Sequence, residues 1–202
     1  MGQSTTLHEA LIPAQGTAVW ARRAALVAFG VAALAVSAKV SVPLWPSPVP
    51  ITMGTFAVLT IGAAYGPGLG LATILAYMIV GALGFDVFAG TGGGVSGIEY
   101  MLGGTGGYLL GYVLATVALG MAARAGWDRN VGRMALAMLI GSALIYVPGV
   151  LWLHQMTTGW AQTLEWGLTP YLIGDALKLA LAAMLFPAIC RLVSKARGGA
   201  GR

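Results

Sequence analysis

Long apolar runs, separated by short clusters of charge, restrict this chain to a fold that lies within a membrane. Of its 202 residues, 58% are hydrophobic and 8% are charged, whereas soluble domains average about 25% charged residues. The length allows about six helices of roughly 20 residues with short connections. We therefore expect an all-α integral membrane protein, built as a single bundle of six transmembrane helices.

The apolar runs also predict where the helices and turns lie. The six spans cover residues 20–40, 51–65, 69–83, 107–123, 134–153 and 170–193. One membrane domain then occupies residues 20–194, between a polar N-terminal tail at 1–19 and a basic tail at 195–202. Gly66-Pro67-Gly68 is expected to form a tight turn between the second and third spans.

Basic residues flank the apolar runs and do not gather into a patch with aromatic residues, so no nucleic acid is expected as a partner. With six crossings, nine of the eleven basic residues fall on one side: Arg22, Arg23, Arg124, Arg129, Arg133, Arg191, Lys195, Arg197 and Arg202. The positive-inside rule then places both termini in the cytoplasm. Lys39, at the outer end of the first span, is expected to extend to the membrane surface.

Asp175 and Lys178 lie near the start of the last span, in a stretch that otherwise suits lipid. Ionisable groups at membrane depth are costly and usually mark a substrate or ion path. Residues three apart share a helix face, so one pocket is expected to contain both charges. There Lys178 is suited to a substrate carboxylate and Asp175 to N–H donors. A buried ion pair with a structural role alone is the alternative.

Other residues allow two interpretations each. Tyr77 and Tyr108 border the glycine-rich segment 84–107 and are either pocket walls or ordinary core residues. Trp45, in a connection with four prolines from Pro43 to Pro50, is either an interfacial anchor or part of a lid. The small residues Ala24, Ala28 and Ala32 form a ridge that suits close helix contact, either within the protein or with a partner.

Several classes of function lack the residues that they need. The chain has no nucleophile with a neighbouring base and no acidic dyad, so we do not expect an enzyme. Two histidines and one cysteine are too few for a usual zinc site, and neither a metal nor a cofactor is expected. No ATP-binding motif occurs, so active transport needs another subunit or an ion gradient.

Six motifs follow one another along the chain: the proline-rich Val42-Pro-Leu-Trp-Pro-Ser-Pro-Val-Pro-Ile-Thr, Thr55-Phe-Ala-Val-Leu, Gly66-Pro-Gly-Leu-Gly, Gly81-Ala-Leu-Gly-Phe-Asp-Val-Phe-Ala-Gly, Gly104-Thr-Gly-Gly-Tyr-Leu-Leu-Gly and Gly174-Asp-Ala-Leu-Lys. Together they resemble the BioY family, the biotin-specific substrate-binding (S) components of energy-coupling factor (ECF) transporters. Asp86 and Gly104 stand where the family usually has proline, and residues 90–103 contain no arginine.

The resemblance implies capture of biotin from outside a bacterial cell (inner) membrane, with a transmembrane coupling protein and two ATPases as partners. It assigns biotin binding to Asp175 and Lys178, to which we add Tyr77, Tyr108, Tyr100 and Phe88. It also makes Trp45, Pro46 and Pro48 part of a lid, and the ridge of Ala24, Ala28 and Ala32 the docking face for the coupling protein. The alternatives are an S component for thiamine or riboflavin, or a membrane protein that does not transport and has a structural Asp-Lys pair.

Overall fold

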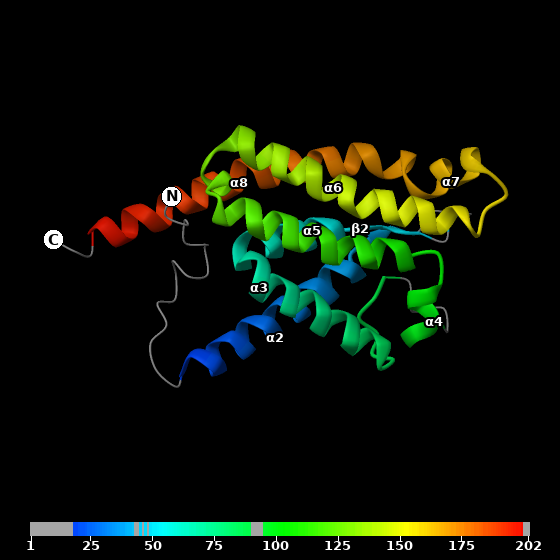
Figure 1. Ribbon diagram of the computed structural model, residues 1–202, viewed down its shortest axis with the longest axis horizontal. Coiled ribbons are helices and arrows are strands. Elements are labelled where there is room, and N and C mark those ends of the chain that lie inside the picture. The colour runs from blue at the N-terminus through cyan, green and yellow to red at the C-terminus, as the bar shows by residue number, and fades with distance from the viewer. Residues whose placement is uncertain (1–17, 43–44, 46, 48, 90–94, 200–202) are drawn as a thin grey trace.

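The computed structural model describes residues 18–42, 45, 47, 49–89 and 95–199. Its helices form an elongated bundle (Figure 1). They are α2 (Ala18–Lys39), α3 (Gly54–Ala82), α4 (Gly97–Leu102), α5 (Gly106–Arg124), α6 (Val131–His154), α7 (Trp160–Gly167) and α8 (Leu172–Gly199), with the 3-10 turns η2 (Trp127–Arg129) and η3 (Thr169–Tyr171).

Five of the described helices are long and apolar enough to cross a membrane. They are α2, α3, α5, α6 and the continuous apolar segment Trp160–Leu192, which includes α7 and most of α8. Large apolar side chains on these helices point outward, among them Phe29, Ile79 and Leu139. Such a surface suits lipid and not water. The predicted all-α membrane fold agrees with this arrangement.

Helix α3 contains a sharp break at the predicted turn. Gly66 has φ 76° and ψ 176°, outside the helical region, and Pro67 follows it. A Cβ atom on Gly70 would lie 3.6 Å from the Cα atom of Gly62, although residues eight apart in a straight helix are separated by about 12 Å. The α3 ribbon therefore runs toward the left in Figure 1 and returns toward the right as a second arm.

Helix α5 packs between α3 and α6, and glycines allow this close approach. A Cβ atom on Gly120 would lie 2.3 Å from the backbone nitrogen of Pro67 in the α3 turn. A Cβ atom on Gly111 would lie 2.6 Å from the Cα atom of Ile145 in α6. Small residues are favoured at helix contacts in membranes because they let backbones approach. These contacts place α5 in the middle of the bundle.

Local signals fix several helix ends. Gly126, with φ 79°, follows the end of α5 in the left-handed conformation that favours glycine. The side chain of Asn130 accepts a hydrogen bond from the backbone N–H of Arg133 and caps the start of α6. The basic residues Arg124, Arg129 and Arg133 thus lie together where α5 passes into α6.

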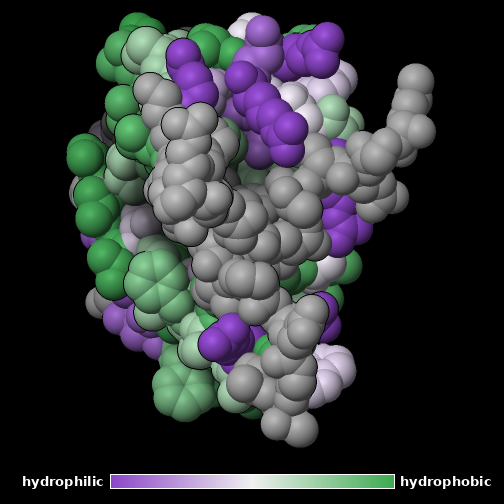
Figure 2. All heavy atoms as spheres, turned by 90° about the vertical axis from the view of Figure 1, so that its left-hand side faces the viewer, coloured by the Kyte–Doolittle hydropathy of each residue, from purple (hydrophilic) through white to green (hydrophobic). Residues whose placement is uncertain are grey.

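The two ends of the bundle differ in charge. α2 and α6 begin at the left-hand end in Figure 1, and α5 and α8 finish there. Figure 2 looks onto this end and shows hydrophilic residues gathered in its upper part, with hydrophobic residues along one side. The basic residues at these helix ends therefore lie at this end of the molecule, the basic pole: Arg22, Arg23, Arg124, Arg133 and Arg191.

The connection between α2 and α3 contains a feature that the all-α prediction missed. Ser41–Val42 (β1) pairs antiparallel with Ile51–Thr52 (β2), with Ser41 opposite Thr52. Prolines between them rule out a helix, but the residues on either side remain able to form a short ladder. The paired strands hold both ends of the connection at one place.

A pair of glycine substitutions tests the packing of α5. Gly120→Ala should lower the free energy of unfolding by about 1–3 kcal/mol, because its methyl group meets the backbone of the α3 turn. Gly68→Ala is the control, since a Cβ atom there has no neighbour within 4 Å. Thermal unfolding in detergent measures both variants, and equal stability of the two would contradict this packing.

Candidate functional site

A cavity lies among the described helices at the pole opposite the basic residues. It contains about 700 Å³ of space not filled by protein atoms, part of it open to solvent. Its walls come from α2, the β2 strand, both arms of α3, α4, α5, α6, η3 and α8. The cavity thus depends on nearly every element of the bundle.

Among the described residues that line this cavity, only Asp175 and Lys178 are charged. The Lys178 Nζ atom lies 2.9 Å from Asp175 Oδ1, and the two side chains are 15% and 14% exposed. Lys178 also donates to the backbone carbonyl of Thr52 at 2.7 Å. The lining therefore has no net charge, and one of the three lysine N–H groups is left for a ligand.

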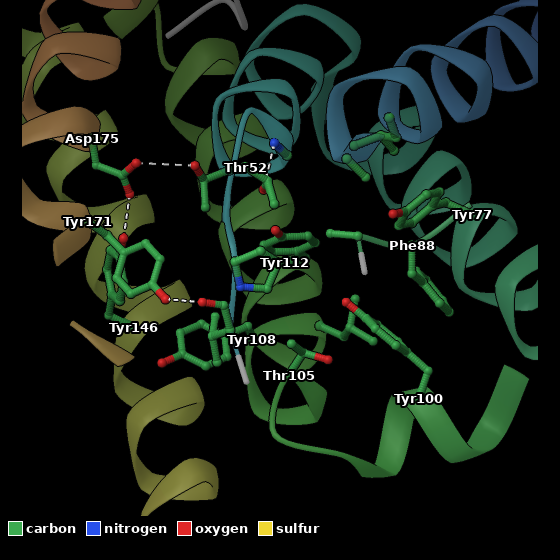
Figure 3. A pocket seen from close by; sticks show the side chains of 18 of the residues that line it. Thr52, Tyr77, Phe88, Tyr100, Thr105, Tyr108, Tyr112, Tyr146, Tyr171 and Asp175 are labelled. Atoms are coloured by element: carbon green, nitrogen blue, oxygen red, sulfur yellow. Dashed lines mark hydrogen bonds between the residues drawn. The ribbon is translucent and has the colours of Figure 1, made fainter. Parts of the chain in front are cut away.

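Two further hydroxyl groups fix the aspartate. Tyr146 of α6 donates to Asp175 Oδ2 at 2.5 Å (Figure 3), and Thr55 of α3 donates to Asp175 Oδ1 at 3.4 Å. Asp175 therefore connects three helices, since it lies on α8 and accepts from α3 and α6.

One wall of the cavity is aromatic. Phe88, 1% exposed, stacks on Tyr100 with ring centroids 5.0 Å apart and meets Tyr77 edge to face at 5.2 Å. Tyr77 donates to the carbonyl of Val87 at 3.0 Å, and Lys39 donates to the carbonyl of Phe88 at 2.9 Å. These bonds fix the segment after α3 against the cavity.

Lys39 has a more specific role than extending to the membrane surface. Besides its bond to Phe88, its ammonium group forms an ion pair with Asp86. The Lys39 side chain is partly exposed and the Asp86 side chain is largely exposed. Lys39 ends α2, so the pair joins that helix to the segment that follows α3.

Burial raises the pKa of Tyr100 in α4, although a hydrogen bond with Thr105 opposes this shift, so Tyr100 is a neutral donor at physiological pH.

On the far side of the cavity, two tyrosines bond to backbone carbonyls. Tyr108 donates to the carbonyl of Gly167 at 2.7 Å, and the single O–H of Tyr171 is shared between the carbonyls of Trp166, at 3.0 Å, and Val49. Ser47 also donates to the carbonyl of Trp166, at 2.8 Å. The connection between β1 and β2 is therefore fastened to α7 and η3.

All six residues predicted to bind the ligand line this one cavity: Asp175, Lys178, Tyr77, Tyr108, Tyr100 and Phe88. Their role in binding stays a prediction. The sequence interpretation did not include Tyr112, Tyr146, Tyr171, Thr52 and Thr55, which line the same space. Helical spacing would have indicated two of them, because Tyr112 follows Tyr108 by four residues and Tyr171 precedes Asp175 by four.

Of the other predicted positions, those that the structure describes do not line the cavity. The Trp45 side chain is 94% exposed, and Pro46 and Pro48 lie outside the described residues. Val49 and Pro50 of the same connection do line the cavity. Ala24, Ala28 and Ala32 are all exposed on α2, so they form no packing seam among the described residues. Within the described chain, no group of three His, Cys, Asp or Glu side chains is arranged to hold a metal ion.

The model of the BioY family matches residues 6–195. The chain is 37% identical over 165 residues to the probable biotin transporter BioY of Pyrococcus horikoshii, an alignment that covers 82% of this chain and 94% of that one. It is 30% identical over 154 residues to the biotin transporter BioY of Thermotoga maritima, covering 76% and 87%.

A solved structure shares the fold. It is the crystal structure of the S-component for biotin from an ECF-type ABC transporter, with a TM-score of 0.73 and 21% sequence identity. The match covers 88% of this chain and 95% of that chain.

The fold defines a multi-pass membrane protein, and its cavity is the candidate site for a small molecule. The chain belongs to the BioY family. The family prediction from the sequence is confirmed.

Two matched substitutions compare the buried and exposed ion pairs. Asp175→Asn should lower the free energy of unfolding by about 3 kcal/mol, because it leaves the largely enclosed Lys178 ammonium, only 15% exposed, without its counter-charge. Asp86→Asn makes the same change in an exposed pair and should cost about 1 kcal/mol or less. Unfolding in detergent measures both, and an equal cost would contradict burial of the Asp175–Lys178 pair.

Proposed function

We propose that this chain is the biotin-binding membrane subunit of an ECF-type vitamin transporter and that it captures biotin in the cavity around Asp175 and Lys178. The observation that carries the proposal is the position of this ion pair in an aromatic cavity of a BioY-family chain. The relatives are named as biotin transporters. A transport subunit, and not an enzyme, is also what the sequence predicts.

Biotin suits the chemistry of this cavity. It carries one carboxylate, a ureido group with donors and an acceptor, and an apolar ring and tail. Asp175 is an acceptor for N–H groups, and Lys178 is a donor for either the ureido oxygen or the carboxylate. Tyr77, Phe88 and Tyr100 offer ring faces and edges to the apolar part of the ligand.

On this proposal the chain crosses a bacterial inner membrane six times, with both termini in the cytoplasm. The two arms of α3 count as separate crossings, and the basic pole faces the cytoplasm. The first arm is short for a membrane of about 30 Å. However, most of its residues from Gly54 to Ala63 are buried by neighbouring helices, so it does not have to match the lipid thickness.

Equilibrium binding of labelled biotin to the detergent-purified protein tests the ligand and the site together. Lys178→Met and Asp175→Asn should each weaken binding by about 30-fold or more, because each leaves one charge of a buried pair without its partner. Tyr146→Phe removes one hydrogen bond to Asp175 and should weaken binding by about fivefold. Asp86→Asn, in the exposed pair, is the matched control and should bind much more tightly than Asp175→Asn.

The folded fraction of each variant is measured by size-exclusion chromatography, so that lost binding is not confused with lost structure. Tight binding of thiamine or riboflavin, with none of biotin, would assign the cavity to another vitamin. Unchanged biotin binding in folded Lys178→Met, Asp175→Asn and Tyr146→Phe would leave the ion pair with a structural role alone.

The proposed partners are a transmembrane coupling protein and two ATPases, and the docking face is the exposed ridge of Ala24, Ala28 and Ala32. Ala28→Trp should leave biotin affinity unchanged and reduce ATP-driven uptake by about tenfold or more, since a large ring prevents close helix approach. Ala180→Trp, at an exposed position of α8, is the control. Equal uptake in the two variants would remove α2 as the docking face.

A further inference from the structure

A second hollow lies on the exterior of the bundle near the basic pole, away from the proposed biotin site. It is a groove of about 610 Å³, partly open to the surroundings, between α5 and α6 at their basic ends. Its lining consists of Ala118, Met121, Ala122, Ala125, Trp127, Ala137 and Ile140. None of these side chains is charged, and four of them are alanines.

The groove follows the direction of the helices. Its lining includes Ala118 and Ala122 of α5 and Ala125, the C-cap residue directly after that helix, and these three share one face. Small side chains on this face leave a channel with apolar walls, which suits an acyl chain. Trp127, half-buried in η2, also lines the groove and lies between Arg124 and Arg129 in the sequence. Tryptophan is enriched at the level of lipid headgroups, so the groove extends from that level into the hydrocarbon.

Positive charge lies at this end of the groove. Arg133 precedes Ala137 by four residues and Ile140 by seven, so it continues the α6 side of the groove toward the basic pole. Arg124 and Arg129 lie at the same junction, and all three arginines are exposed. The nearby Asp128 is 2% exposed, and its Oδ2 accepts from Cys190 of α8 at 3.5 Å, so its carboxylate is directed into the protein.

We propose that this groove binds an anionic phospholipid, with one acyl chain along the alanines of α5 and the phosphate at Arg129 and Arg133. Basic sites between transmembrane helices on the cytoplasmic side bind anionic headgroups in this way. A second copy of the chain is a poorer occupant, because a symmetric contact would bring the arginines of both copies together. The inference does not depend on biotin binding.

Native mass spectrometry of the full chain, purified in detergent with equal amounts of phosphatidylglycerol and phosphatidylcholine, tests the proposal. The wild type should retain phosphatidylglycerol in preference to phosphatidylcholine. Arg129→Gln combined with Arg133→Gln should reduce this preference by about tenfold or more. Arg22→Gln combined with Arg23→Gln removes the same charge from α2, at the same pole but on a different helix, and should keep the preference.

A second pair of variants tests the groove itself. Ala122→Leu fills the channel and should also reduce retention of phosphatidylglycerol, whereas Ala180→Leu adds the same atoms at an exposed position of α8 and should not. An equal loss in both arginine pairs would mean that lipid follows general charge, and the proposal would fail. A dimer in the wild type that Ala122→Leu dissociates would assign the groove to a second copy instead.

Discussion

Close backbone contact at the glycines of α5 is the constraint on which the rest of the structure depends. Lipid tails are as apolar as leucine, so burial of apolar surface gives helices in a membrane little reason to associate, and packing at short distance has to hold them. Gly120 admits the α3 turn, and Gly111 admits α6. Through these contacts α5 sets the spacing between α3 and α6, and the hydrogen bonds to Asp175 come from those two helices.

The ion pair has more than one structural connection. Lys178 donates to Thr52, which ends the β2 strand, while Asp175 accepts from Tyr146 and Thr55. A change at the pair therefore reaches the β1–β2 connection as well as three helices. A similar link occurs on the other wall, where Lys39 of α2 holds Asp86 and the carbonyl of Phe88. Both lysines are thus bonded to backbone that borders the cavity.

The two poles of the molecule provide different chemistry from the same apolar framework. Aromatic and hydroxyl side chains at one pole surround a polar pair inside the bundle. At the other pole the arginines stay on the surface, next to a groove with apolar walls. A ligand that enters the first must be small enough to be enclosed, whereas an occupant of the second remains largely in the membrane. The proposed vitamin and the proposed lipid therefore use separate surfaces of the chain.

Much of this organisation follows from the sequence by itself. Apolar run length predicts the membrane class, and Gly66-Pro67 predicts the break in α3 because a helix cannot continue through that geometry. Asp175 and Lys178 share a face because they are three apart on one helix. The tertiary structure alone decided that Tyr146, 29 residues from Asp175, and Thr52, 126 residues from Lys178, are their partners. Helix packing sets such distances, and no local pattern specifies which side chains it brings together.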